Sequence, residues 1–262
     1  MIGLAGCGRM GKPMLSSLRS MGIRAKGFDI VNNDSDWITN DPKRFGAELS
    51  TLITVVRDID QTEEVLFGTQ AFVTTAPRLE QIIICSTLSP RYLYDLRRRV
   101  PDEIKMIDAP MSGAQIAAER AELSFMLGGN DEDLDDAQLL FGSMGKYFHR
   151  MGGFGAGMQA KVLNNMLAAS HTAMTRMILD WADHAGIEEQ ALLELINTSS
   201  GQNWLASGFN EIEFSRAGYE TDNTIGILEK DIESAIDAAP EGADLKPAKV
   251  IQSMIRALKP RN

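Results

Sequence analysis

The most constraining feature of the chain is a glycine pattern at its start, Gly6-Cys7-Gly8-Arg9-Met10-Gly11. It follows a short apolar run, Ile2–Ala5, which predicts a buried strand. It precedes Met10–Met21, which predicts a helix. A G-x-G-x-x-G pattern between a strand and a helix is typical of a dinucleotide-binding loop.

Each glycine in this loop has its own physical reason. Gly6 permits the tight turn, Gly8 lets a pyrophosphate approach the backbone, and Gly11 lets the helix and the strand pack closely. The phosphates would lie at the positive N-terminus of the helix. All six loop residues, Gly6 to Gly11, are therefore candidate cofactor contacts, although an ordinary glycine-rich turn between strand and helix would also contain the pattern.

A carboxylate follows the second expected strand, Ile23–Phe28, and narrows the choice of dinucleotide. Asp29 lies 18 residues after Gly11, close to the spacing of an acid that binds the adenosine ribose hydroxyls. Its charge would repel a 2′-phosphate, so the sequence favours NAD over NADP. The alternative is a loop aspartate that caps the next turn.

Composition limits the partners of the chain. The 262 residues carry a net charge of −10, which argues against nucleic acid or an anionic membrane as a partner. The two cysteines, Cys7 and Cys85, have no metal-ligand spacing, so no metal site is expected, and they fit a reducing, cytoplasmic compartment. The sequence shows no signal-peptide pattern and no long apolar segment, so neither secretion nor a membrane span is expected.

The first part of the chain alternates short apolar runs with amphipathic segments, which predicts a doubly wound α/β sheet. We expect a Rossmann-type dinucleotide-binding domain over residues 1–153. Beyond the two strands already named, the expected strands are Leu52–Val56, Gln81–Cys85, Lys105–Ile107, Ser124–Leu127 and Tyr147–His149, and the expected helices include Asp60–Leu66 and Pro90–Val100.

The second part, residues 154–262, is expected to be all-helical. The boundary is placed at the segment Gly152–Gly157, because four glycines in six residues interrupt regular structure. A long interdomain helix follows, since Met158–Ala185 contains neither glycine nor proline. Further helices are expected at Glu188–Asn197, Thr224–Ala239 and Pro247–Leu258.

Two loops that follow strands of the first part contain polar residues that are candidates for binding the cofactor or the substrate. Thr87 follows the fourth strand and is a candidate cofactor contact, whereas Ser89 before Pro90 is expected to cap a helix. After the fifth strand, Ser112 and the amide of Gly113 offer donors to a substrate carboxylate. A plain turn would also use proline, serine and glycine at this place.

The long helix carries the third candidate. Lys161 and Asn165 are four residues apart and therefore share one helix face. A partly buried lysine can donate or accept a proton at a substrate oxygen, and the asparagine can hold that oxygen or a carboxylate. The alternative is a solvated lysine and a surface asparagine.

Taken together, these motifs resemble the β-hydroxyacid dehydrogenase family, which includes 3-hydroxyisobutyrate and tartronate semialdehyde dehydrogenases. The resemblance runs in order over nearly the whole chain. It rests on Gly3–Met14, Ser86–Pro90, Asp108–Gly113, Met126–Gly129, the pattern from Gly155 to Asn165, and Lys230-Asp231.

The resemblance implies a role for each matching residue. Lys161 corresponds to the catalytic general acid/base and Asn165 to its substrate-binding partner. Ser112 and Gly113 correspond to the grip on the substrate carboxylate. Cofactor contacts are implied at Thr87 and Lys230, and Val56 and Arg57 are expected near the adenine and ribose. The implied activity is hydride transfer between NAD(P) and a small β-hydroxy acid such as 3-hydroxyisobutyrate, in a homodimer or homotetramer.

The chain also departs from the family pattern. Ala114 stands where a second glycine is usual, Ala121-Glu122 where the family often has Gly-Thr, and Arg57 where a proline is common. These changes alter the expected surroundings of the substrate. Two other functions stay open: an imine reductase-like enzyme, against which Lys161 argues, and a cofactor-binding interaction module without turnover.

Overall fold

The computed structural model of the chain describes residues 1–31 and 35–261. The chain forms two compact units, Met1–Lys161 and Val162–Asn262. We call them the first unit and the second unit and describe each by itself.

The described part of the first unit contains a nine-stranded sheet in the order β3-β2-β1-β4-β5-β6-β8-β7, with β9 paired to β8. Pairing is parallel from β3 to β6 and between β8 and β9, whereas β8 runs antiparallel to β6 and β7. The order from β3 to β6 is that of a doubly wound nucleotide-binding fold, which confirms the expected fold class. The strands are β1 (Ile2–Ala5), β2 (Ala25–Phe28), β3 (Ile38–Thr39), β4 (Thr51–Thr54), β5 (Gln81–Ile84), β6 (Lys105–Asp108), β7 (Met111–Ser112), β8 (Leu123–Gly128) and β9 (Gly145–Gly152).

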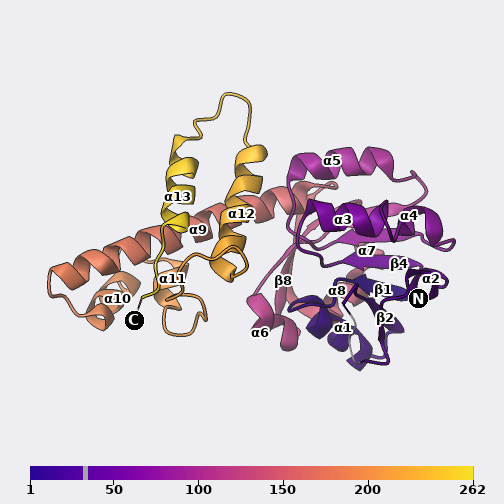
Figure 1. The fold of residues 1–262 in the computed structure, drawn as a ribbon, viewed down its shortest axis with the longest axis horizontal. Helices are drawn as coiled ribbons and strands as arrows, with labels where there is room; N and C mark the ends of the chain where they lie inside the picture. The colour runs from indigo at the N-terminus through magenta and orange to yellow at the C-terminus, as the bar shows by residue number, and fades with distance from the viewer. Residues whose placement is uncertain (32–34, 262) are drawn as a thin grey trace. The chain divides into compact units, whose positions relative to one another are not determined.

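Helices cover both faces of this sheet (Figure 1). Neighbouring residues of one strand belong to different cores: Ile53 packs with α1 and α8, whereas Leu52 packs with α3 and α5. Because both faces are covered, the middle of the central strands is apolar, as at Leu52-Ile53 of β4 and Ile82-Ile83-Ile84 of β5. The helices are α1 (Gly11–Ser20), α2 (Pro42–Gly46), α3 (Ile59–Leu66), α4 (Phe72–Thr75), α5 (Pro90–Arg99), α6 (Ala114–Glu119), α7 (Asp131–Asp136) and α8 (Gln138–Met144).

Helix α9 (Ala156–His184) begins in the first unit and continues through the second. In the second unit its residues Ala169 and Ala173 pack against α12 and α13, and Leu179 packs against α10 and α11. All regular elements described here are helical, as expected: α10 (Glu189–Asn197), α11 (Trp204–Ser207), α12 (Thr224–Asp237) and α13 (Lys246–Arg256).

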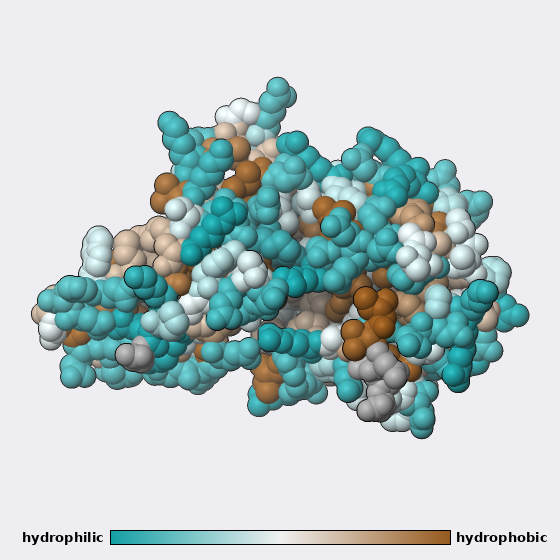
Figure 2. Space-filling model, in the orientation of Figure 1, coloured by the Kyte–Doolittle hydropathy of each residue, from teal (hydrophilic) through white to brown (hydrophobic). Residues whose placement is uncertain are grey.

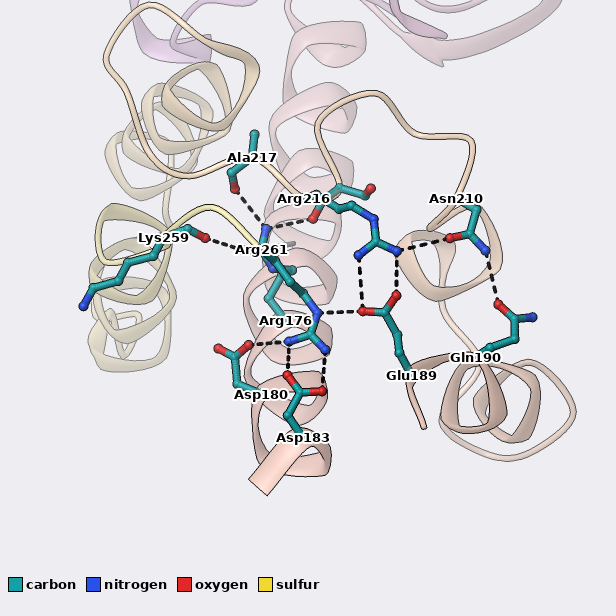
Figure 3. Close-up of polar contacts among 11 residues, drawn as sticks. Arg176, Asp180, Asp183, Glu189, Gln190, Asn210, Arg216, Ala217, Lys259 and Arg261 are labelled. Atoms are coloured by element: carbon teal, nitrogen blue, oxygen red, sulfur yellow. Dashed lines mark hydrogen bonds and ion pairs between the residues drawn. The ribbon is translucent and has the colours of Figure 1, made fainter. Parts of the chain in front are cut away.

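A buried arginine holds separate segments of the second unit together (Figure 3). Arg176 is 2% exposed, and its guanidinium donates to the carbonyl oxygens of Ser215 at 2.7 Å, Ala217 at 2.9 Å and Lys259 at 2.5 Å. Burial lowers the pKa of this guanidinium. These carbonyls therefore satisfy a charge that would otherwise be costly to bury.

A second arginine lies beside it and pairs with acids. Arg261 contacts Asp180 at 2.7 Å, Asp183 at 2.7 Å and Glu189 at 2.6 Å (Figure 3). Burial disfavours the charge of Glu189, but hydrogen bonds from Arg216 and Arg261 outweigh this and lower its pKa. The last described residue is thereby attached to the end of α9 and the start of α10.

Three alanines described in the first unit adopt left-handed backbone conformations, among them Ala71 with φ +48° before α4. Ala114 has φ +53° and Ala121 has φ +54°, at the two ends of the segment that contains α6. These are the positions at which the sequence departs from a family glycine. A side chain in this region costs about 1–2 kcal/mol. The departures thus strain the backbone here.

One face of the molecule is mainly polar. On the face shown in Figure 2 hydrophilic side chains predominate, in keeping with the 24% of charged residues. Among the helices of residues 1–31 and 35–261, none combines the length and the apolar character that crossing a membrane requires.

Candidate functional site

The glycine loop lies at the switch point of the sheet, where β1 is flanked by β2 and β4. Gly6 has φ +95°, and its amide donates to the carbonyl of Phe28 at 2.9 Å. Helix α1 begins at Gly11 and has no acidic residue in its first turn. Its N-terminal dipole is therefore not neutralised by a carboxylate of that turn.

The glycines of the loop differ in what surrounds them. A Cβ at Gly11 would overlap the carbonyl oxygen of Gly6, and a Cβ at Gly6 would overlap that of Val55. A Cβ at Gly8, in contrast, would meet nothing within 4 Å. Gly11 and Gly6 are thus required by the fold, whereas the space at Gly8 is open to a ligand.

A cavity of about 610 Å³ adjoins this open space. Its lining includes Cys7, Gly8, Arg9 and Lys12, so two cations stand beside the loop. A pyrophosphate of a dinucleotide would fit this place, because the loop offers the helix N-terminus, the open space at Gly8 and two cations. Met10 precedes α1 and packs partly buried against the core of the first unit.

Asp29 lies directly after β2, as the sequence predicts. One carboxylate oxygen accepts from the amide of Cys7 at 2.8 Å and the other from the amide of Val31 at 2.9 Å. The side chain therefore both joins the glycine loop to the end of β2 and forms the turn that was the alternative interpretation. Burial raises the pKa of the Cys7 thiol to about 12, and the charge of Asp29 adds to this, so the thiol stays protonated at neutral pH.

The loops after β4 and β5 are joined by a hydrogen bond. The amide of Val56 donates to the hydroxyl of Ser86 at 2.9 Å, and the amide of Arg57 to the side chain of Gln61 at 3.1 Å. Ser89 accepts from the amide of Arg91 at 3.2 Å and caps α5, as expected. Thr87 is half-buried between these residues.

The loop after β6 meets the start of α9. Lys161 Nζ donates to Ser112 Oγ at 3.2 Å, across 49 residues of sequence. Lys161 is only 7% exposed, so the interpretation as a solvated lysine is wrong. Gly113, with φ +133°, follows Ser112 in a conformation that favours glycine. The structure therefore brings the predicted lysine nitrogen and the predicted serine hydroxyl together.

Asn165 occupies a buried position in the second unit. It is 8% exposed, so the surface interpretation is wrong here too, and its amide donates to Asp231 at 2.6 Å. Lys230 Nζ lies 3.5 Å from the other carboxylate oxygen of Asp231, which has no hydrogen-bond partner among the described residues. Sequence reasoning gave a role to Lys230 and none to Asp231, although both belong to the same motif.

A second carboxylate, that of Asp108, was also given no role from the sequence. Asp108 ends β6, is fully buried, and accepts from the amides of Gly155 at 2.6 Å and Met158 at 2.5 Å. Burial raises the pKa of Asp108 to about 6, against the opposing effect of these backbone hydrogen bonds. The signal in the sequence was an acid at the end of a strand, directly before the serine motif.

Two family models together match almost the entire chain. Residues 1–153 match the NAD binding domain of 6-phosphogluconate dehydrogenase, and residues 155–261 match the NAD-binding domain of NADP-dependent 3-hydroxyisobutyrate dehydrogenase. The chain belongs to the β-hydroxyacid dehydrogenase family. As a member of this family it is an NAD-binding protein and a hydroxyacid dehydrogenase in its general class.

Curated relatives in this family are about equally distant. The mitochondrial 3-hydroxyisobutyrate dehydrogenase of Rattus norvegicus is 26% identical over 252 residues, covering 91% of this chain and 75% of that protein. L-threonate dehydrogenase of Cupriavidus necator is 26% identical, with 91% and 83% covered. NAD-dependent L-serine dehydrogenase of Pseudomonas aeruginosa is 26% identical, with 94% and 87% covered.

Solved structures of the family share the fold. The 3-hydroxyisobutyrate dehydrogenase of Mycobacterium tuberculosis, solved with L-serine, superposes with a TM-score of 0.82 at 23% identity, covering 98% of this chain and 95% of that one. An imine reductase from Myxococcus stipitatus superposes with a TM-score of 0.64 at 12% identity, covering 98% and 92%. Both enzyme types that the sequence left open therefore use this fold.

Proposed function

We propose that the protein catalyses the reversible, NAD-dependent oxidation of a small β-hydroxy acid. The observation that carries the proposal is the contact between buried Lys161 and half-buried Ser112, with 3.2 Å between Nζ and Oγ, in the same unit as the glycine loop. A buried amine beside a hydroxyl can exchange a proton with a substrate oxygen and is protected from bulk water.

Each predicted site residue has a defined task in this proposal. Lys161 Nζ takes the proton of the substrate hydroxyl during oxidation and returns it during reduction. Ser112 Oγ and the amide of Gly113 bind the substrate carboxylate as neutral donors, and Asn165 binds the hydroxyl or the carboxylate. NAD, when bound, supplies the hydride chemistry, while the protein provides position and orientation.

The substrate class follows from what three relatives have in common. They are named for 3-hydroxyisobutyrate, L-threonate and L-serine. Each of these molecules is a carboxylate with a hydroxyl on the third carbon. A site with hydroxyl and amide donors for the carboxylate and a lysine for the hydroxyl would accept this shared part, and the remaining substituent would distinguish one substrate from another.

We further propose NAD as the preferred dinucleotide. Asp29 is fixed at the end of β2 by two backbone amides, so its carboxylate cannot move away from a ribose without losing them. The negative charge opposes a 2′-phosphate at this place. Val56, Arg57 and Thr87 would contact the same cofactor from the loops after β4 and β5, and Lys230 would contact it from α12.

The direct test is a steady-state assay of the wild-type protein. L-Serine, 3-hydroxyisobutyrate and L-threonate are each supplied with NAD and with NADP, and formation of the reduced cofactor is followed at 340 nm. We expect turnover of at least one hydroxy acid, with kcat/KM higher for NAD. Reduction of a cyclic imine without oxidation of any hydroxy acid would instead identify an imine reductase, and tight NADH binding without any turnover would identify a binding module.

A homo-oligomer assembled through α9 is also proposed. In the second unit this helix exposes large apolar side chains along its length: Leu163 (56%), Leu167 (60%), Met174 (43%) and Trp181 (63%). Exposed apolar surface of this kind usually marks a protein–protein contact. Light scattering coupled to size exclusion should give the mass of two or four chains, and Leu167→Asp should reduce that mass to one chain.

A further inference from the structure

The carboxylate of Asp108 is built into the start of helix α9. Its two oxygens accept separately, one from the amide of Gly155 at 2.6 Å and the other from the amide of Met158 at 2.5 Å. These amides belong to the residues around the first turn of the helix, where backbone donors have no partner within the helix. Asp108 is thus an N-terminal cap of α9 supplied by a strand 47 residues earlier.

Glycines make room for this carboxylate. A Cβ at Gly128 would overlap Asp108 Oδ1, and a Cβ at Gly157 would overlap the carbonyl oxygen of Met126. Gly155 adopts φ +96°, which a larger residue would tolerate poorly. The glycines of the boundary segment therefore allow α9 to approach the ends of β6 and β8 closely, in addition to ending β9.

The same carboxylate connects both members of the Lys161–Ser112 pair. Met158, whose amide it accepts, lies one helical turn before Lys161, and Ser112 lies four residues after Asp108. A third loop joins at this point, because the amide of Leu88 lies 3.3 Å from the sulfur of Met158. Movement of the helix start would therefore displace the lysine from the serine directly.

We propose that Asp108 is a positioning residue that holds Lys161 Nζ against Ser112 Oγ. The expected effect of Asp108 on turnover rests on the proposed function. Hydrogen bonds to an ionised acceptor are about twice as strong as neutral ones, so two of them fix the first turn of α9 firmly. Burial raises the pKa of the Cys85 thiol, and the charge of Asp108 adds to this, so the thiol stays neutral. Asp108 itself touches no reacting atom in this scheme.

The kinetic test uses two substitutions. Asp108→Asn keeps one acceptor for the helix amides, and we expect it to lower kcat for the hydroxy acid about tenfold. Asp108→Ala keeps no acceptor and should lower kcat about 100-fold, since a misplacement near 1 Å can cost that much. The dissociation constant of NADH should stay unchanged in both. Asp41→Asn is the matched control, because Asp41 caps α2 by accepting from the amides of Lys43 at 2.9 Å and Arg44 at 3.2 Å, and it should keep the wild-type kcat.

A chemical readout separates this proposal from the proposed function. Acetylation of lysines by acetic anhydride, quantified by mass spectrometry, needs no turnover. Lys161 is 7% exposed in the structure. We expect the acetylation of Lys161 to rise about tenfold in Asp108→Asn, because release of the helix start exposes the amine. This rise would equal the expected fall in kcat in size. The exposed Lys43 should label at the same rate in wild type and variant.

The outcomes point in distinct directions. Wild-type kcat with unchanged Lys161 labelling in Asp108→Asn would overturn the positioning role and leave the proposed function intact. A parallel loss of kcat, NADH binding and melting temperature with equal labelling of both lysines would reduce Asp108 to a general stability role and overturn the proposal as well. If the wild type oxidises no hydroxy acid, the proposed function fails, and selective labelling of Lys161 alone then decides whether Asp108 holds it.

Discussion

Lys161 Nζ donates a hydrogen bond to Ser112 Oγ over 3.2 Å, and the two residues come from different elements, α9 and β7. The contact joins the lysine nitrogen to a neutral hydroxyl oxygen, so it orients the amine without pairing it with an acid. In the proposed function, the group that transfers the proton and the group that binds the carboxylate are thereby held at one hydrogen-bond length. Removing either one should produce a different kinetic signature.

For Lys161→Ala we expect kcat to fall by about 10³, because positioned proton transfer contributes 10²–10⁴. Binding of NADH, measured by its fluorescence, should be unchanged, since the glycine loop is unaffected. Lys146→Ala removes an exposed lysine of the same unit and should keep wild-type turnover. Wild-type turnover in Lys161→Ala would show that another group transfers the proton.

For Ser112→Ala we expect mainly a higher KM for the hydroxy acid. The lost hydroxyl is a donor to a charged carboxylate, which is worth about 1.5–3 kcal/mol and corresponds to at least a tenfold change in KM. The KM for NAD should stay the same. Initial-rate kinetics with both substrates varied would check this, and a change confined to kcat would assign Ser112 to lysine positioning alone.

The glycine loop allows a matched pair of substitutions. Gly11→Ala places a methyl group against the Gly6 carbonyl and should lower the free energy of unfolding by at least about 2 kcal/mol. Gly8→Ala meets no neighbour within 4 Å, so it should unfold like the wild type but bind NADH at least about tenfold more weakly, because the methyl group occupies the space for the pyrophosphate. Urea denaturation and NADH titration test both. Equal NADH affinity in Gly8→Ala would remove the pyrophosphate from this position.

Asp108 should give stability an unusual dependence on pH. Its pKa is about 6 when folded and near 3.8 when unfolded, so the folded state binds more protons between these values. Its contribution to stability is therefore fully present below pH 3.8 and is lost as the pH rises through 6. Relative to Asp108→Asn, the wild type should gain about 2 kcal/mol in its free energy of unfolding at pH 4.5 compared with pH 7.5.

Urea denaturation of both proteins at the two pH values measures this difference. Asp183→Asn is a control of opposite sign, because the hydrogen bond from Arg261 lowers the pKa of Asp183, and its contribution is lost as the pH falls. If the difference in free energy of unfolding between wild type and Asp108→Asn does not vary with pH, Asp108 lies in a more polar environment than the structure shows.

The strained alanines predict stabilising substitutions. Ala114→Gly and Ala121→Gly should each raise the free energy of unfolding by about 0.5–1 kcal/mol, because relief of the left-handed strain exceeds the entropy that glycine loses on folding. The control is Ala118, which lies between the two alanines in α6 and has no positive φ. Ala118→Gly should destabilise the protein by about 1 kcal/mol. Thermal unfolding of the three variants is sufficient to test this.

The sequence was informative where structure depends on near neighbours. The strand, loop and helix around Gly6–Gly11, the cap at Ser89 and the long helix were all predictable from spacing within a few residues. Short elements such as α4 (Phe72–Thr75) were missed, because four residues give no helical periodicity to detect.

The contacts that bury the site residues could not be predicted in the same way. The hydrogen bonds of Asp108 span 47 and 50 residues, and that between Asn165 and Asp231 spans 66. No local pattern carries such information, so Lys161 and Asn165 were equally compatible with a solvent-exposed position. The fold brings their partners to them only once distant segments have met.

The buried guanidinium of Arg176 has a consequence for how the chain is synthesised and folds. Its three carbonyl partners lie 39, 41 and 83 residues further along the chain. Contacts of such long range slow folding, since a large loop must close before any of them forms. On the ribosome the hydrogen bond from Arg176 to the carbonyl of Lys259 cannot form until Lys259 has left the exit tunnel. The second unit should therefore acquire its native core after translation of that segment, and a nascent chain halted before it should remain open to proteolysis.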